Sequence, residues 1–102
     1  MNLYGLLQRA EAESSPVRVG LIGAGKFGSM FLAQAARTPG LHVVGVADLD
    51  LQRARETLDR VGWPPEQCGA PDLETARDRG TTCVTDDGTA LIALDGLQVI
   101  VE

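Results

Sequence analysis

Three closely spaced glycines, Gly23, Gly25 and Gly28, constrain the fold of this chain more than any other feature. They follow directly on VRVGLI, residues 17–22, a short and mostly apolar run that predicts a buried strand. Good helix formers then continue from about residue 26 to 38. A strand that turns through glycines straight into a helix indicates the first βα unit of an α/β fold.

The predicted elements go on alternating along the chain. Further strands are expected at residues 41–47, 81–85 and 97–101, and further helices at residues 50–61, 72–79 and 86–94. Strands that are apolar almost throughout are typical of a parallel sheet covered on both faces. Right-handed crossovers with a reversal after the third strand predict a three-layer, doubly wound α/β sheet of the Rossmann type, with strand order 3-2-1-4.

The helix faces and ends can also be predicted. The packed face of the first helix of this sheet is expected to consist of Phe27, Met30, Phe31, Gln34 and Ala35. Asp50 is placed to cap the next helix, and Gly62 stands where a left-handed residue ends it.

The first 16 residues differ from the rest. Leu3, Leu6, Leu7 and Ala10 recur at helical spacing, which predicts a short amphipathic helix that ends before Pro16. We therefore expect an N-terminal helix and linker at residues 1–16 and one domain at residues 17–102. Neither a signal peptide nor a membrane helix is indicated, so a cytoplasmic protein is expected, without a membrane partner.

Charge and composition exclude some functions. The 102 residues carry a net charge of −5, which argues against a nucleic-acid partner. Residues 1–51 hold four basic and four acidic side chains, so this half opposes an anionic ligand less than the acidic second half does. Cys68 and Cys83 are the only cysteines and His42 the only histidine, too few for a zinc site. Two reduced thiols and no metal are expected.

An acidic residue completes the glycine pattern. Asp48 stands at the end of the second predicted strand, 20 positions after Gly28. Together with the strand–turn–helix context, this spacing is typical of dinucleotide-binding proteins. Gly23 permits the tight turn, Gly25 lets a pyrophosphate approach the backbone, and Gly28 lets the helix pack closely on the sheet.

Backbone groups and one carboxylate would hold the ligand. The N–H groups of Lys26, Phe27 and Gly28, at the positive end of the helix dipole, are expected to bind the phosphates. Asp48 is expected to accept hydrogen bonds from the adenosine ribose hydroxyls. The predicted cofactor-binding residues are therefore Gly23, Gly25, Lys26, Phe27, Gly28 and Asp48.

Asp48 also bears on the choice of cofactor. A 2′-phosphate about 4 Å from this carboxylate would meet a repulsion of roughly 4 kcal/mol at an effective dielectric constant of about 20. Residue 49, where a basic partner would be useful, is leucine. Arg53 and Arg55 on the following helix could reach across to such a phosphate, but they are interpreted as solvated helix charges. NAD is therefore predicted, with NADP disfavoured.

The segment VRVGLIGAGKFGSMFLAQAARTPGLHVVGVAD, residues 17–48, resembles the N-terminal NAD(P)-binding domain of homoserine dehydrogenases and of Gfo/Idh/MocA oxidoreductases. CVTDDGTALIALDGLQVIVE, residues 83–102, is similar to their third strand, short helix and fourth strand. With the N-terminal LYGLLQRAEAE, the chain most resembles homoserine-dehydrogenase-like oxidoreductases that carry a SAF domain. It departs from the family at Leu32, where a small residue is usual.

The resemblance implies the pyrophosphate loop and the ribose contact already described. It also implies that Thr85 and Asp86 lie toward the adenine, although a role in capping the next helix is the favoured alternative. These families bind a small carbonyl or hydroxyl substrate with a further domain. Their remaining strands, their catalytic lysine or its equivalent, and this substrate domain have no counterpart in residues 1–102. We therefore expect a piece of a longer oxidoreductase, with catalytic residues that this sequence does not identify.

Other interpretations remain open. A sensing module of the RCK type, found in potassium channels, also uses a G-x-G-x-F-G turn, and a methyltransferase-like fold would bind S-adenosylmethionine. The latter usually has an acidic residue where this chain has Ile22. His42 and Trp63 are interpreted as structural, and the acidic residues of 72–78 as a solvated helix face. The edge of the fourth strand is expected to be exposed, which favours a homo-oligomer.

Overall fold

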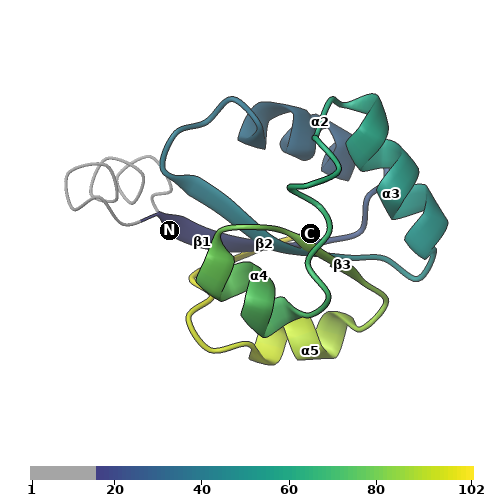
Figure 1. The fold of residues 1–102 in the computed structure, drawn as a ribbon. Coiled ribbons are helices and arrows are strands. Elements are labelled where there is room, and N and C mark those ends of the chain that lie inside the picture. Colours follow the sequence, from purple (N-terminus) through teal and green to yellow (C-terminus); the bar gives the residue numbers. More distant parts are fainter. Residues whose placement is uncertain (1–15) are drawn as a thin grey trace.

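The computed structural model describes residues 16–102, and Figure 1 shows a parallel sheet between two layers of helices. In chain order the elements are β1 (Val17–Ile22), α2 (Lys26–Ala35), β2 (Leu41–Ala47), α3 (Leu51–Arg60), α4 (Leu73–Arg79), β3 (Cys83–Thr85), α5 (Gly88–Ala93) and β4 (Val99–Val101). The strand order is β3-β2-β1-β4 with every pair parallel, which confirms the predicted Rossmann-type fold. The predicted N-terminal helix lies outside the described residues.

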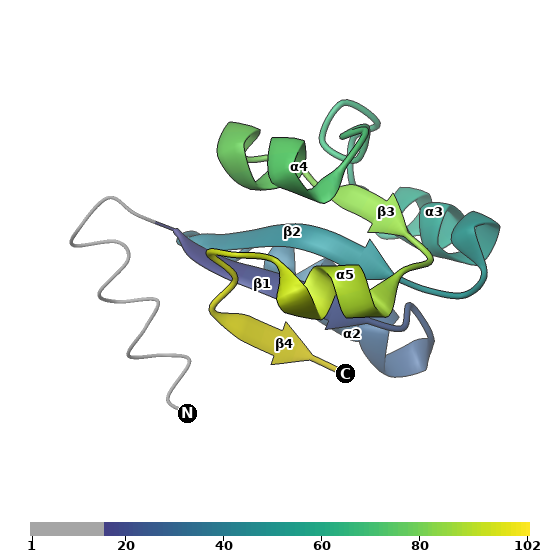
Figure 2. The same cartoon turned by 90° about the horizontal axis from the view of Figure 1, so that it is seen from below.

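The two helical layers cover opposite faces of the sheet. Helices α2 and α3 lie on one face and α4 and α5 on the other, as the two perpendicular views in Figures 1 and 2 show. The core on the first face includes Leu21, Leu32, Val46, Leu58 and Trp63. The core on the second face includes Val44, Ala47, Leu73, Ala76 and Leu91. Strands buried on both sides explain why the strand sequences are apolar throughout.

The predicted packed face of α2 is only partly correct. Phe27 and Met30 are 58% and 62% exposed, whereas the buried residues of α2 are Gly28, Leu32 and Ala35. Of the other predicted face residues, Ala35 is indeed buried, Phe31 is partly buried and Gln34 is exposed.

The buried side of α2 is determined by the close approach of this helix to the turn before it. A Cβ on Gly28 would overlap the carbonyl oxygen of Gly23, so only a glycine allows this contact. Once Gly28 faces the sheet, Leu32 follows one turn later on the same side and becomes fully buried. The large side chain that departs from the family pattern is therefore part of the core.

The two residues predicted at the ends of α3 are confirmed, whereas α5 is capped by a residue that was not predicted to do so. The Asp50 carboxylate accepts a hydrogen bond from the backbone N–H of Arg53 at 3.0 Å, and Gly62, after α3, has a φ of 91°. The Asp87 carboxylate caps α5 through the N–H of Ala90 at 2.9 Å. Among the described residues, no helix is both long enough and apolar enough to cross a membrane.

Candidate functional site

The loops that follow β1, β2 and β3 meet at the carboxyl edge of the sheet. They enclose a cavity of about 300 Å³ lined by Ile22, Gly23, Ala47, Asp48, Leu49, Arg53, Asp86 and Gly88. The chain crosses from β3 at one end of the sheet to β4 beside β1, so the strand order reverses next to the glycine turn. In open α/β sheets, ligands bind at such a switch point, outside the carboxyl ends of the strands.

Each glycine of the turn has a distinct environment. Gly23 has a φ of 87°, and its N–H donates to the carbonyl of Ala47 at 2.7 Å, which ties the turn to the end of β2. Gly25 precedes α2 in an extended conformation, and a Cβ built on it would have no atom within 4 Å apart from those of its own two chain neighbours. Gly28, in contrast, is pressed against Gly23. Gly25 is therefore not required by packing within the described chain, whereas Gly28 is.

The first turn of α2 presents unused donors beside this open space. The first helical hydrogen bond runs from the N–H of Ser29 to the carbonyl of Gly25 at 2.8 Å. Within residues 16–102 no acceptor is found for the N–H groups of Lys26, Phe27 and Gly28, and no acidic side chain occupies this turn. Three free N–H groups at a positive dipole end suit an anion such as a phosphate.

Asp48 points toward the glycine turn. Its carboxylate accepts hydrogen bonds from the backbone N–H groups of Ala24 and Asp50, both at 2.9 Å, and the side chain is only 2% exposed. Burial alone would raise the pKa of this carboxyl. The hydrogen bonds from Asp50 and Ala24 and the Arg53 guanidinium outweigh burial, and the pKa lies below its ordinary value. Asp48 is therefore a buried anion at neutral pH.

Arg53 is not the free solvated charge expected from the sequence. Its Nη2 lies 2.8 Å from Oδ1 and 2.9 Å from Oδ2 of Asp48, and its Nε donates to Oδ2 at 3.3 Å. The Arg53 side chain is nevertheless 56% exposed, so it covers the carboxylate from the solvent side. Arg55 is exposed, as expected, and lines a different cavity beside Cys68.

The lowered pKa of Asp48 predicts a dependence of stability on pH. Asp48 stabilises the folded state above its unfolded pKa of about 3.9, and this contribution is lost as the pH falls through the lower folded pKa. Urea unfolding at pH 7 and pH 3 should therefore show a smaller loss of stability for Asp48→Asn than for the wild type. Asp86→Asn, which changes an exposed carboxylate in the same cavity, is the control and should behave like the wild type. An equal pH dependence in Asp48→Asn would contradict the prediction.

Of the other residues singled out in the sequence, one lines the candidate site and the rest support the fold. Asp86 lines the cavity, and the Thr85 hydroxyl accepts a hydrogen bond from the N–H of Asp87 at 3.1 Å. The N-cap of α5 is Asp87, so neither Thr85 nor Asp86 takes the predicted capping role. His42 contacts the carbonyl of Thr81 through Nε2 at 2.7 Å, and Trp63 donates from Nε1 to the carbonyl of Leu32 at 3.0 Å. Both side chains are buried, in agreement with their interpretation as structural.

Between residues 16 and 102, the cysteines and acidic groups offer no other reactive centre. Both cysteines are free thiols, and burial raises their pKa, which keeps them protonated. In the part of the chain that the structure describes, no three His, Cys, Asp or Glu side chains are arranged to hold a metal ion.

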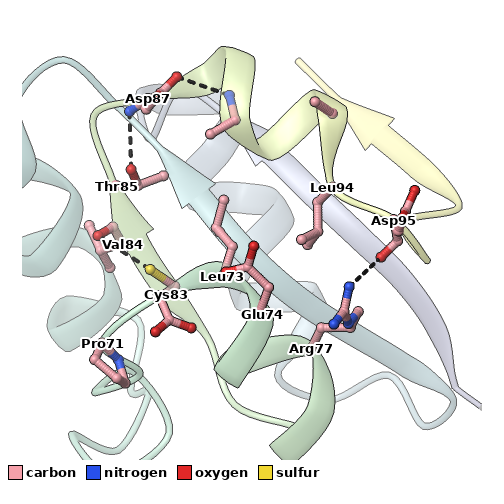
Figure 3. A pocket seen from close by; sticks show the side chains of 13 residues that line it. Pro71, Leu73, Glu74, Arg77, Cys83, Val84, Thr85, Asp87, Leu94 and Asp95 are labelled. Carbon is pink, nitrogen blue, oxygen red and sulfur yellow. Dashed lines mark hydrogen bonds between the residues drawn. The ribbon is translucent and has the colours of Figure 1, made fainter.

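A larger cavity, of about 680 Å³, lies between α4 and α5 on the other face of the sheet (Figure 3). Several of its polar groups already have partners within the fold. Arg77 donates to the carbonyl of Asp95 at 3.0 Å, and the Asp87 carboxylate caps α5. This cavity lacks the glycine turn and its free N–H groups, so the smaller cavity at the carboxyl edge is the better candidate site.

Sequence reasoning missed the part that Arg53 takes in this site. A signal was available, because Asp50 was correctly expected to cap α3, and this cap places residue 53 in the first helical turn. A long side chain there, close after the end of β2, is within reach of Asp48.

The comparison with protein families agrees with this geometry. The model of a family described as "Oxidoreductase family, NAD-binding Rossmann fold" (GFO_IDH_MocA) matches residues 17–85. The match spans the glycine turn, Asp48, Arg53 and β3, and it favours an oxidoreductase over the sensing-module and methyltransferase alternatives. A comparison with curated proteins gave no match.

Proposed function

Because this chain belongs to the Gfo/Idh/MocA oxidoreductase family with its NAD-binding Rossmann fold, we propose that residues 17–102 bind NAD for a homoserine-dehydrogenase-like oxidoreductase. The observation that carries this proposal is the open space at Gly25, beside the free N–H groups of α2. A pyrophosphate placed there would meet donors and a positive dipole end, with no side chain in its way.

The remaining contacts concern the adenosine half of the cofactor. Asp48 is the acceptor for the ribose hydroxyls, and Asp86 lines the cavity in which the adenosine would lie. When bound, the cofactor supplies hydride transfer, and this part of the chain contributes its position and electrostatics. The buried charge of Asp48 opposes a second negative group, so we propose that NAD is preferred to NADP.

The substrate side of the reaction rests on the resemblance alone. We propose a small carbonyl or hydroxyl substrate, held by a further domain, in an enzyme of the cytoplasm. The resemblance to SAF-containing relatives motivates the homoserine-dehydrogenase-like assignment.

Titration calorimetry of the chain with NADH, NADPH, ADP-ribose and S-adenosylmethionine tests the proposal. NADH is expected to bind more tightly than NADPH, and ADP-ribose nearly as tightly as NADH, because all the groups named above contact the adenosine and pyrophosphate. S-adenosylmethionine, which lacks a pyrophosphate, is expected not to bind. Binding of S-adenosylmethionine without NADH would overturn the proposal.

A further inference from the structure

The Asp48 carboxylate has no lone pair left for a ligand in this structure. A carboxylate offers about four lone-pair sites for hydrogen bonds. The N–H groups of Ala24 and Asp50 take one on each oxygen, and the Arg53 guanidinium contacts both oxygens as well. With 2% of the Asp48 side chain exposed, a ribose cannot touch the carboxylate while Arg53 remains on it.

Of these donors, only Arg53 can leave without disturbing the fold. The Ala24 and Asp50 donors are backbone groups, and Ala24 itself is buried. The Arg53 side chain is long and 56% exposed, so its guanidinium can exchange Asp48 for water. The two ribose hydroxyls would then take the positions that the guanidinium held. Arg53 and the ribose therefore compete for the same two oxygens.

After it leaves Asp48, Arg53 remains beside the ligand. Its backbone is fixed in the first turn of α3, and its side chain lines the same cavity as Gly23 and Asp48. With NAD, this position offers the guanidinium no anionic partner on the ribose. With NADP, a 2′-phosphate on the same ribose would give the planar guanidinium a bidentate partner and offset the repulsion from Asp48.

We propose that Arg53 determines cofactor specificity in two opposing ways: it competes with the ribose of NAD for Asp48, and it pairs with the 2′-phosphate of NADP. This inference rests on the proposed function, because it requires a dinucleotide at this cavity. It predicts that a single substitution shifts the two affinities in opposite directions.

The test is titration of the wild type, Arg53→Ala, Arg53→Met and Arg55→Ala with NADH and NADPH at low salt. Loss of the competing guanidinium is expected to tighten NADH binding about threefold to tenfold, because the carboxylate no longer has to be freed first. Loss of the bidentate partner is expected to weaken NADPH binding about tenfold or more. Arg53→Met keeps the aliphatic stem and should reproduce Arg53→Ala, and thermal unfolding checks that each variant is folded.

Arg55→Ala removes the same charge from the same helix and should leave both affinities within about twofold of the wild type. Weaker or unchanged NADH binding in both folded Arg53 variants would refute the competition, and unchanged NADPH binding would refute the phosphate contact. If Arg55→Ala changed the affinities for NADH and NADPH as much as the Arg53 variants do, net charge alone would explain the changes, and the inference would be overturned. If the wild type binds neither dinucleotide, the proposed function fails first, which separates the two results.

Discussion

Gly28→Ala is expected to destabilise the fold by about 3 kcal/mol, the upper end of the usual range for an overpacked core. The new Cβ would overlap the carbonyl oxygen of Gly23, and the Leu21 side chain lies 3.5 Å away on the same side. Relief requires α2 to move off the sheet, which would disturb the fully buried Leu32. Urea unfolding followed by circular dichroism measures the loss.

Gly25→Ala is the matched control for this experiment. It makes the same chemical change three residues earlier, where no atom lies within 4 Å of the new Cβ and where the φ of −73° suits any residue. Its free energy of unfolding should stay within about 0.5 kcal/mol of the wild type. Equal stabilities for the two variants would mean that the contact between α2 and the glycine turn does not matter.

Gly25→Val should leave the fold intact and reduce NADH binding at least about a hundredfold, a loss of about 2.8 kcal/mol. The valine side chain would fill the open space beside the free N–H groups of Lys26 and Phe27, where we place the pyrophosphate. Gly25→Ala should give an intermediate loss. Calorimetry measures the affinities, and unfolding measurements on the same samples establish that stability is unchanged.

Gly69→Ala provides the control for glycine loss away from the site. Gly69 lies beside Cys68 in a different cavity, and its nearest neighbour is 3.4 Å from the new Cβ. It should bind NADH like the wild type. If Gly25→Val also bound NADH normally, the phosphates would have to lie elsewhere, and the proposed function would lose its main support.

The fold was predictable because its signals are local. Each strand is a short apolar run, and the predicted cap at Asp50 acts on its own helix. The ends were less certain: α2 stops at Ala35 rather than at residue 38, and β4 begins at Val99 rather than at residue 97. Strand and helix ends depend on neighbouring elements, which the local pattern does not contain.

The two failures have a common cause in tertiary geometry. Hydrophobicity favoured Phe27 and Met30 for the packed face of α2, but the contact between Gly28 and Gly23 turned another side of the helix toward the sheet. Arg53 was read as a solvated charge, but the fold brings a buried carboxylate within its reach. In both cases a spatial contact decided the result, and helical periodicity alone carries no information about it.

The bonds from the Ala24 and Asp50 amides to Asp48 mean that a single side chain joins two loops as well as facing the proposed sugar site. Replacing this acid to change the nucleotide preference would also cut the link between those loops. Leaving the Ala24 amide buried without an acceptor would cost about 1–3 kcal/mol. Substitution of Arg53 avoids that penalty, because its side chain joins no loops. Natural or engineered changes in nucleotide preference should therefore occur first at position 53.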